Sequence, residues 1–192
     1  MDHLLAWSQD FERVSFLDSS RHPTSGLSDQ FHSLVALGAK RELTAQTGNA
    51  FQQLKAFQQA EKDWLFGFLG YDLKNEVENL HSHHPDGVEL PDLHFFQPEH
   101  VIRVSSNRVE VATLGTSPES VYQAVLRAAP LATAPPNPPL QLKARIPKAA
   151  YLHTIGKLKA HIRQGDIYEV NFCQEFFAAN ASLNPYATFQ RL

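Results

Sequence analysis

Three histidines and an acid lie close together in one short stretch: His81, His83, His84 and Asp86. Imidazole and carboxylate groups are ligands of zinc, so this stretch raises the question of a metal site. A zinc-binding helix places two histidines four positions apart, whereas these histidines are one and two positions apart with no cysteine cluster beside them. Pro85 also interrupts the stretch. We therefore expect a solvated loop here.

A lone cysteine and a pair of glycines are the next candidates for chemistry. Cys173 has no neighbouring cysteine and histidine signature and lies in an apolar stretch, where a thiol usually behaves as a small hydrophobe. Gly67 and Gly70 form a GxxG inside an apolar run and do not lead into a helix, unlike a dinucleotide-binding loop. We expect Cys173 to be structural, and the glycines to mark close packing.

Four glutamates could in principle act as acid–base groups or magnesium ligands. Glu76 and Glu78 lie in a charged stretch, and Glu169 and Glu175 fall on the polar side of an alternating one. Carboxylates on helix surfaces and half-exposed strands are most often solvated. We expect that state for these four.

Composition narrows the class of protein. The 192 residues include 43% hydrophobic ones, enough for a real core, and 17 Lys and Arg against 20 Asp and Glu give a net charge of -3. No window gathers the basic residues that nucleic-acid binding needs. No stretch approaches the roughly 20 apolar residues that cross a membrane, and the N-terminus lacks the pattern of a signal peptide. The expected location is cytoplasmic.

The elements that would position these residues begin with two short apolar runs, 14–17 and 34–37. Turn-forming residues lie at the ends of these runs, as they do at the ends of strands, so we expect two strands. Apolar residues at spacings of three predict a helix over 51–61. Residues 64–71 carry bulky side chains at both odd and even positions, which predicts a central strand buried on both faces. Residues 72–80 predict a short helix.

Further strands are expected at 95–96, 101–104 and 108–112, the last two joined as an antiparallel hairpin by Ser105-Ser106-Asn107. Ser117 and Pro118 then provide the cap and the first residue of a helix that runs to about residue 129.

A proline-rich stretch follows and predicts a domain boundary. We expect an N-terminal domain over 1–129, a linker over 130–147 and the start of a second domain over 148–192. The second domain should contain a helix over 148–164 ended by Gly165, a strand over 168–176, and a last helix capped by Asn184. The fold class is α+β, with largely antiparallel sheets and flanking helices.

Several sequence blocks together resemble those of a known enzyme family. They are Trp64–Asp72, Leu90–Asp92, Tyr151 and Ile162–Asn171, in that order. In order and spacing they resemble the chorismate-utilising enzymes, the large-subunit family of anthranilate synthase and aminodeoxychorismate synthase. The block Gly165–Asn171 is the most specific, and its asparagine is more typical of component I of aminodeoxychorismate synthase.

The resemblance implies an enzyme that uses Mg²⁺ and takes ammonia from a glutamine amidotransferase, component II. It would convert chorismate to 4-amino-4-deoxychorismate for p-aminobenzoate and folate biosynthesis. Two alternatives stay open: component I of anthranilate synthase, in tryptophan biosynthesis, and a non-catalytic module that binds the amidotransferase.

The resemblance also implies where site residues lie. The family's magnesium-binding glutamates, acid–base groups and lysine nucleophile belong to its C-terminal part and would follow Leu192, so we expect no catalytic or metal residue in this chain and no turnover by it alone. The family's tryptophan pocket uses a strand serine that matches Ser19, within Phe16–Ser19. A second part of that pocket would align near Ser28–Phe31, where only Phe31 agrees.

Overall fold

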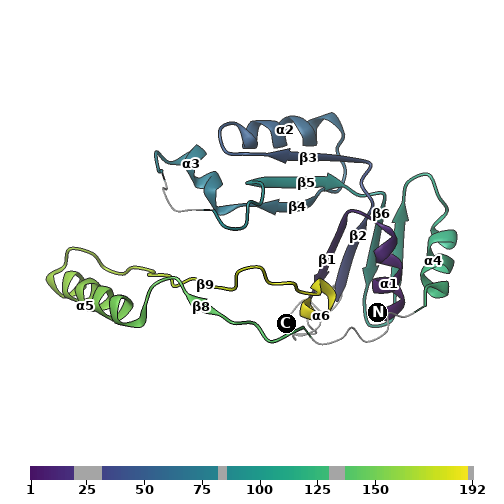
Figure 1. Cartoon of the computed structure of the whole chain (residues 1–192). Helices are drawn as coiled ribbons and strands as arrows, with labels where there is room; N and C mark the ends of the chain where they lie inside the picture. The colour runs from purple at the N-terminus through teal and green to yellow at the C-terminus, as the bar shows by residue number, and fades with distance from the viewer. Residues whose placement is uncertain (20–31, 82–85, 130–136, 190–192) are drawn as a thin grey trace. The chain divides into compact units, whose positions relative to one another are not determined.

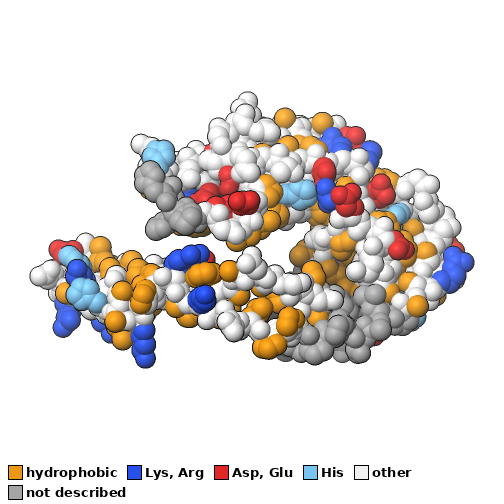
Figure 2. Space-filling model, in the orientation of Figure 1, with side chains coloured by type: hydrophobic (Ala, Val, Ile, Leu, Met, Phe, Trp, Pro, Cys, Tyr) orange, Lys and Arg blue, Asp and Glu red, His pale blue; other side chains and the backbone are white. Residues whose placement is uncertain are grey.

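The computed structural model describes residues 1–19, 32–81, 86–129 and 137–189 of the chain (Figure 1, and in space-filling form Figure 2). Contacts between residues divide the chain into two compact units, Met1–Leu131 and Ala132–Leu192. The division falls inside the proline-rich stretch.

The first unit contains a four-stranded antiparallel sheet in the order β1-β2-β6-β7 (Figure 1). Strand alternation places Val35, Leu37 and Ile102 on one face, where they form a core with Leu4 and Val121 from two helices. These two helices, α1 and α4, are in contact with each other. The elements are α1 (Asp2–Trp7), the 3₁₀ turn η1 (Ser8–Asp10), β1 (Val14–Asp18), β2 (Ser33–Leu37), β6 (His100–Val104), β7 (Val109–Thr113) and α4 (Pro118–Arg127).

A second, three-stranded antiparallel sheet belongs to the same unit and has the order β3-β5-β4. Leu43 and Phe95 of this sheet pack with Leu54 of α2, so that helix covers one face. The elements are β3 (Arg41–Ala45), α2 (Ala50–Ala60), β4 (Phe66–Leu69), the 3₁₀ turn η2 (Tyr71–Leu73), α3 (Lys74–Val77) and β5 (Leu93–Gln97).

The two sheets share a core. Leu34 and Ala36 point away from the helices of the first sheet and pack against Phe66 and Phe96 of the second. Phe66 and Phe96 are register partners on β4 and β5. The apolar residues of β2 are therefore buried on both faces of the strand, and all five of its residues are buried.

Most predicted elements of this unit are confirmed, including the strands at 14–17 and 34–37 and the hairpin at 101–112. The prediction that 64–71 forms a central strand is wrong. Only Phe66–Leu69 form a strand, and it lies at the edge of its sheet with Phe68 and Leu69 exposed. The segment predicted as a helix over 72–80 forms only the turn η2 and the single turn of α3.

The second unit is built around α5 (Lys148–Gln164), whose bounds match the prediction. Gly165 follows in the left-handed conformation with φ 85°, and the backbone N–H of Gly165 donates to Ile162. The strand predicted over 168–176 is wrong, because only β9 (Phe176–Phe177) forms and pairs with β8 (Lys143–Ala144). The last helix is α6 (Pro185–Phe189), capped by the Asn184 side chain through the N–H of Ala187.

Candidate functional site

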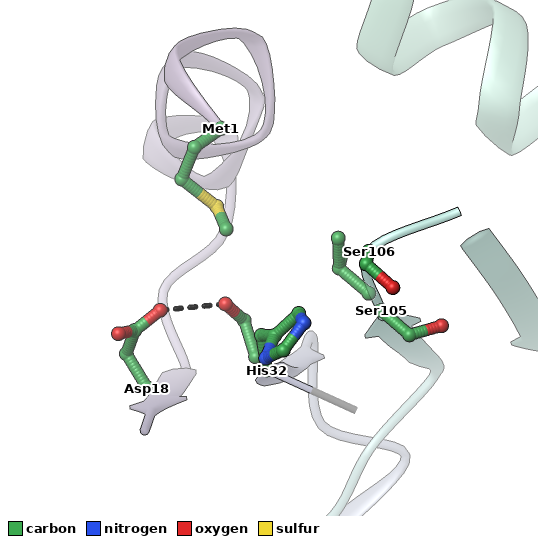
Figure 3. A pocket seen from close by; sticks show the side chains of 7 residues that line it. Met1, Asp18, His32, Ser105 and Ser106 are labelled. Atoms are coloured by element: carbon green, nitrogen blue, oxygen red, sulfur yellow. Dashed lines mark hydrogen bonds between the residues drawn. The ribbon is translucent and has the colours of Figure 1, made fainter. Parts of the chain in front are cut away.

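A cavity of about 460 Å³ lies at one end of the four-stranded sheet (Figure 3). Antiparallel pairing brings the end of β1, the start of β2 and the end of β6 together there. The cavity is lined by Met1, Asp18, His32, Ser33, Val104, Ser105 and Ser106. We call it the Asp18 cavity.

Its central polar contact joins β1 to β2. The hydroxyl of Ser33, which is 1% exposed, donates to Oδ2 of Asp18 at 2.6 Å. Figure 3 draws this bond as the dashed line at Asp18. A buried hydroxyl thus fixes the carboxylate at the cavity wall. Next to it, the N–H of Ser19 donates to the carbonyl of His32 at 2.8 Å, and the N–H of His32 donates to the carbonyl of Val104 at 2.6 Å. These bonds extend the ladder beyond the strands and hold the imidazole at the cavity.

The residues of the Asp18 cavity are better suited to binding a ligand than to catalysis. One carboxylate, one imidazole and the hydroxyls of Ser105 and Ser106 offer acceptors and donors around a space large enough for a small metabolite. The carboxylate favours a ligand that carries a cationic group such as an ammonium.

The sequence-predicted effector residue lies beside this cavity without lining it. Ser19 is exposed and directly follows Asp18 at the end of β1. The second predicted part, Ser28–Phe31, lies outside the described residues. Sequence reasoning missed Asp18, His32 and Ser33 as site residues. Asp18 belongs to the motif that suggested Ser19, and Ser105-Ser106 was recognised only as a turn.

The predicted solvated loop is described only at its two ends. His81 and Asp86 are exposed, and His83 and His84 lie outside the described residues. Asp86 accepts from the N–H groups of Glu89 and Val88, and these bonds lower the pKa of its carboxyl. Among the described residues, no three His, Cys, Asp or Glu side chains come close enough to hold a metal ion.

Two of the four glutamates expected to be solvated have structural roles instead. Glu76 accepts from the N–H groups of Gly48, Ala50 and Phe51 at 2.7, 2.6 and 3.3 Å, and so caps the N-terminus of α2. Desolvation raises the pKa of Glu76, but the backbone donors outweigh it and the net shift is downward.

Glu175 is the second of these glutamates. It accepts from Nε and Nη2 of Arg145 at 3.0 and 2.9 Å, which lowers the pKa of its carboxyl. The hydrogen bond to Arg145 is the largest cause of that shift. This bidentate pair joins the segment before α5 to the segment that follows the block Gly165–Asn171.

The outcomes for the remaining candidates differ. Cys173 is exposed and does not lie in a strand, so the expectation of a small hydrophobe in a strand is wrong. Close packing at the glycines is confirmed, because a Cβ on Gly67 would lie 1.9 Å from the carbonyl oxygen of His94. In the described part of the chain, no helix is both long and apolar enough to cross a membrane.

Comparison with known proteins places the chain in a family. Residues 12–192 match the sequence profile described as chorismate binding enzyme, so the chain belongs to that family. Similar proteins include anthranilate synthase component 1 of Cereibacter sphaeroides, 30% identical over 148 residues, and that of Thermus thermophilus, 28% identical over 139 residues. Each alignment covers 67% of this chain, but only 29% and 30% of the relative.

A solved structure shares the fold. The crystal structure of anthranilate synthase component I from Streptococcus pneumoniae TIGR4 aligns with a TM-score of 0.65 and 17% sequence identity. The match covers 91% of this chain and 47% of that one. The chain thus spans less than a third of the curated relatives named above and about half of the solved structure.

Proposed function

We propose that the chain is the N-terminal part of component I of a chorismate-aminating synthase. The observation that carries the proposal is the profile match over residues 12–192, which includes the block Gly165–Asn171. In the proposed reaction, ammonia from a glutamine amidotransferase attacks chorismate. A C–N bond forms, the C–O bond of a ring hydroxyl breaks, and water leaves.

The specific product that we propose is 4-amino-4-deoxychorismate, on the way to p-aminobenzoate and folate. Asn171 at the end of the block supports this product, because the anthranilate branch more often has an aliphatic residue there. Anthranilate is the second candidate product, and the names of the similar proteins from Cereibacter sphaeroides and Thermus thermophilus favour it.

The chemistry of either product would place Mg²⁺ on a substrate carboxylate and a general acid at the departing hydroxyl. The described residues do not assemble three ligands for a metal ion, so we derive no step through Mg²⁺ from this chain. We propose that it contributes structure and regulation and has no turnover alone.

We further propose that the Asp18 cavity and the adjacent Ser19 form the effector pocket, with tryptophan as ligand. The carboxylate of Asp18, held by Ser33, would receive the ligand's ammonium group. Calorimetric titration with L-tryptophan tests this role, with Ser19→Ala and Asp18→Asn as variants. Indole-3-propionate, which lacks the ammonium group, is the comparison ligand. Equal binding of both ligands, or unchanged affinity in both variants, would count against the pocket.

An activity assay of the full-length gene product distinguishes the two candidate products. Incubation with chorismate, Mg²⁺ and ammonia, followed by mass spectrometry, should give aminodeoxychorismate. Anthranilate as the sole product would establish the second candidate. Full-length protein that binds the amidotransferase but makes neither compound would show that the chain serves as a non-catalytic interaction module.

A further inference from the structure

A second cavity, distinct from the Asp18 cavity and sharing no residue with it, lies where the two sheets of the first unit meet. It has a volume of about 190 Å³. Its walls come from the loop before β4, the turn between β5 and β6, and the strands β6 and β7. The lining residues that matter here are Asp63, Trp64, Glu99, Val101, Arg103 and Ala112. We call it the Trp64 cavity.

The charge of this cavity is negative. Asp63 and Glu99 are its two acids, and both are exposed. Among the described residues that line it, Arg103 is the one base, and Nη2 of Arg103 lies 2.5 Å from a carboxylate oxygen of Glu110, which does not line the cavity. Glu110 also pairs with Arg108, so the carboxylates of Asp63, Glu99 and Glu110 outnumber the two arginines and the region keeps a net negative charge, which favours a cationic ligand.

One of these carboxylates is held in place by a buried amide. The side chain of Gln97, 2% exposed, donates from Nε2 to Oδ2 of Asp63 at 3.0 Å, and the N–H of Trp64 donates to Oδ1 of Asp63 at 2.7 Å. The amide oxygen of Gln97 is buried without a hydrogen-bond partner, which is unfavourable. The side chain of Gln97 also hydrogen-bonds the carboxylate of Glu61, so this buried amide holds acids of the loop before β4, Asp63 among them.

An aromatic wall completes the cavity. Trp64 is 48% exposed, and its ring stacks on Phe66 with the centroids 6.0 Å apart and an interplanar angle of 15°. Stacking fixes the plane of the indole. An exposed indole face beside two carboxylates attracts a cation through its π-system and also packs against a flat apolar group.

We propose that the Trp64 cavity binds a small primary amine with a flat apolar body, its ammonium group at Asp63 and Glu99 and its body against Trp64 and Val101. The volume limits the ligand to a small molecule. Binding here does not depend on the reaction or the effector pocket proposed above.

The test is an NMR titration of the 192-residue chain with benzylamine as probe, with benzyl alcohol as the uncharged comparison. Saturable shifts of the Trp64 indole N–H are expected with the amine only. Asp63→Asn and Glu99→Gln should each weaken binding about tenfold, since each removes a charged acceptor. Glu119→Gln, an exposed acid on α4, is the matched control and should leave the affinity unchanged.

A second variant guards against a misfolded protein. Trp64→Leu should keep a dispersed spectrum and lose most of the binding, which is then followed through the Val101 and Ala112 amides. The proposal is overturned if benzyl alcohol binds as well as benzylamine, if the two acid variants bind normally, or if the shifts map to the Asp18 cavity instead.

Discussion

Among the glycines that the structure describes, Gly67 has the least room for a side chain. An added Cβ would lie 1.9 Å from the carbonyl oxygen of His94 and 2.7 Å from Cα of Phe95, both backbone atoms of β5. Non-bonded heavy atoms pack at roughly 3.5 Å, so Gly67→Ala must separate β4 from β5 by about 1.5 Å. Such a separation breaks hydrogen bonds between the two strands.

The expected loss in the free energy of unfolding is about 3 kcal/mol or more, from overpacking together with lost ladder bonds of about 1 kcal/mol each. With a urea dependence of about 1–3 kcal/mol per molar, the midpoint of unfolding should fall by at least about 1 M. Tryptophan fluorescence is the assay, because both tryptophans, Trp7 and Trp64, lie in the first unit.

Gly87→Ala is the matched control in the same unit, because no atom lies within 4 Å of a Cβ at Gly87. Its midpoint should stay within about 0.2–0.5 M of the parent, a surface-substitution effect below about 0.5 kcal/mol. If Gly67→Ala unfolds at the same urea concentration as Gly87→Ala, the close contact between β4 and β5 is refuted.

Three further predictions concern stability. Burial lowers the pKa of His100 below its ordinary 6.5, so the protein binds fewer protons than the unfolded chain, and its urea midpoint should fall as the pH drops from about 7.5 to 5.5. His100→Gln should flatten that decline, and an unchanged slope would contradict it. Glu76→Gln should weaken the cap of α2 and speed hydrogen exchange at the Ala50 amide, whereas Glu78→Gln should leave that rate unchanged. Ser117→Ala should cost about 1 kcal/mol by urea unfolding, because the Ser117 hydroxyl accepts from the N–H of Ser120; a loss below about 0.3 kcal/mol would reject this cap.

The elements that sequence predicted well are those with local signals. Ser117 and Pro118 mark the start of α4, and Gly165 marks the end of α5, because capping depends on residues within one turn. The strands β1 and β2 were visible because their apolar runs are bounded by turn-forming residues.

The failures have tertiary causes. β3, Arg-Glu-Leu-Thr-Ala, alternates only weakly in hydrophobicity and was missed, because it is held by pairing with β5 and packing under α2. Since β5 takes the central position, β4 is left at the edge despite its apolar sequence. The segment 168–175 has a strand pattern but forms no ladder with the described residues, and a pattern alone does not supply a pairing partner.

The candidate site was predictable only in part. Ser19 came from a short motif, but the cavity beside it depends on the register that places Ser33 opposite Asp18. The register is set by the pairing of strands that are distant in the sequence, and no single residue of β2 predicts it. The sequence likewise indicates only a surface acid at Glu76. The N–H groups of Gly48 and Ala50, which donate to its carboxylate, are more than twenty positions away in the chain.

The pair Arg145–Glu175 and the two-residue ladder of β8 and β9 have a mechanical consequence for the second unit. Tension applied to the two ends of this unit would load first the hydrogen bonds of Asn137 to Asn184 and Thr188, and then that short ladder with its ion pair, and α5 would lie outside the load path. The helix and the block after it would therefore stay slack until the ladder ruptures, and the released length would then appear in one step.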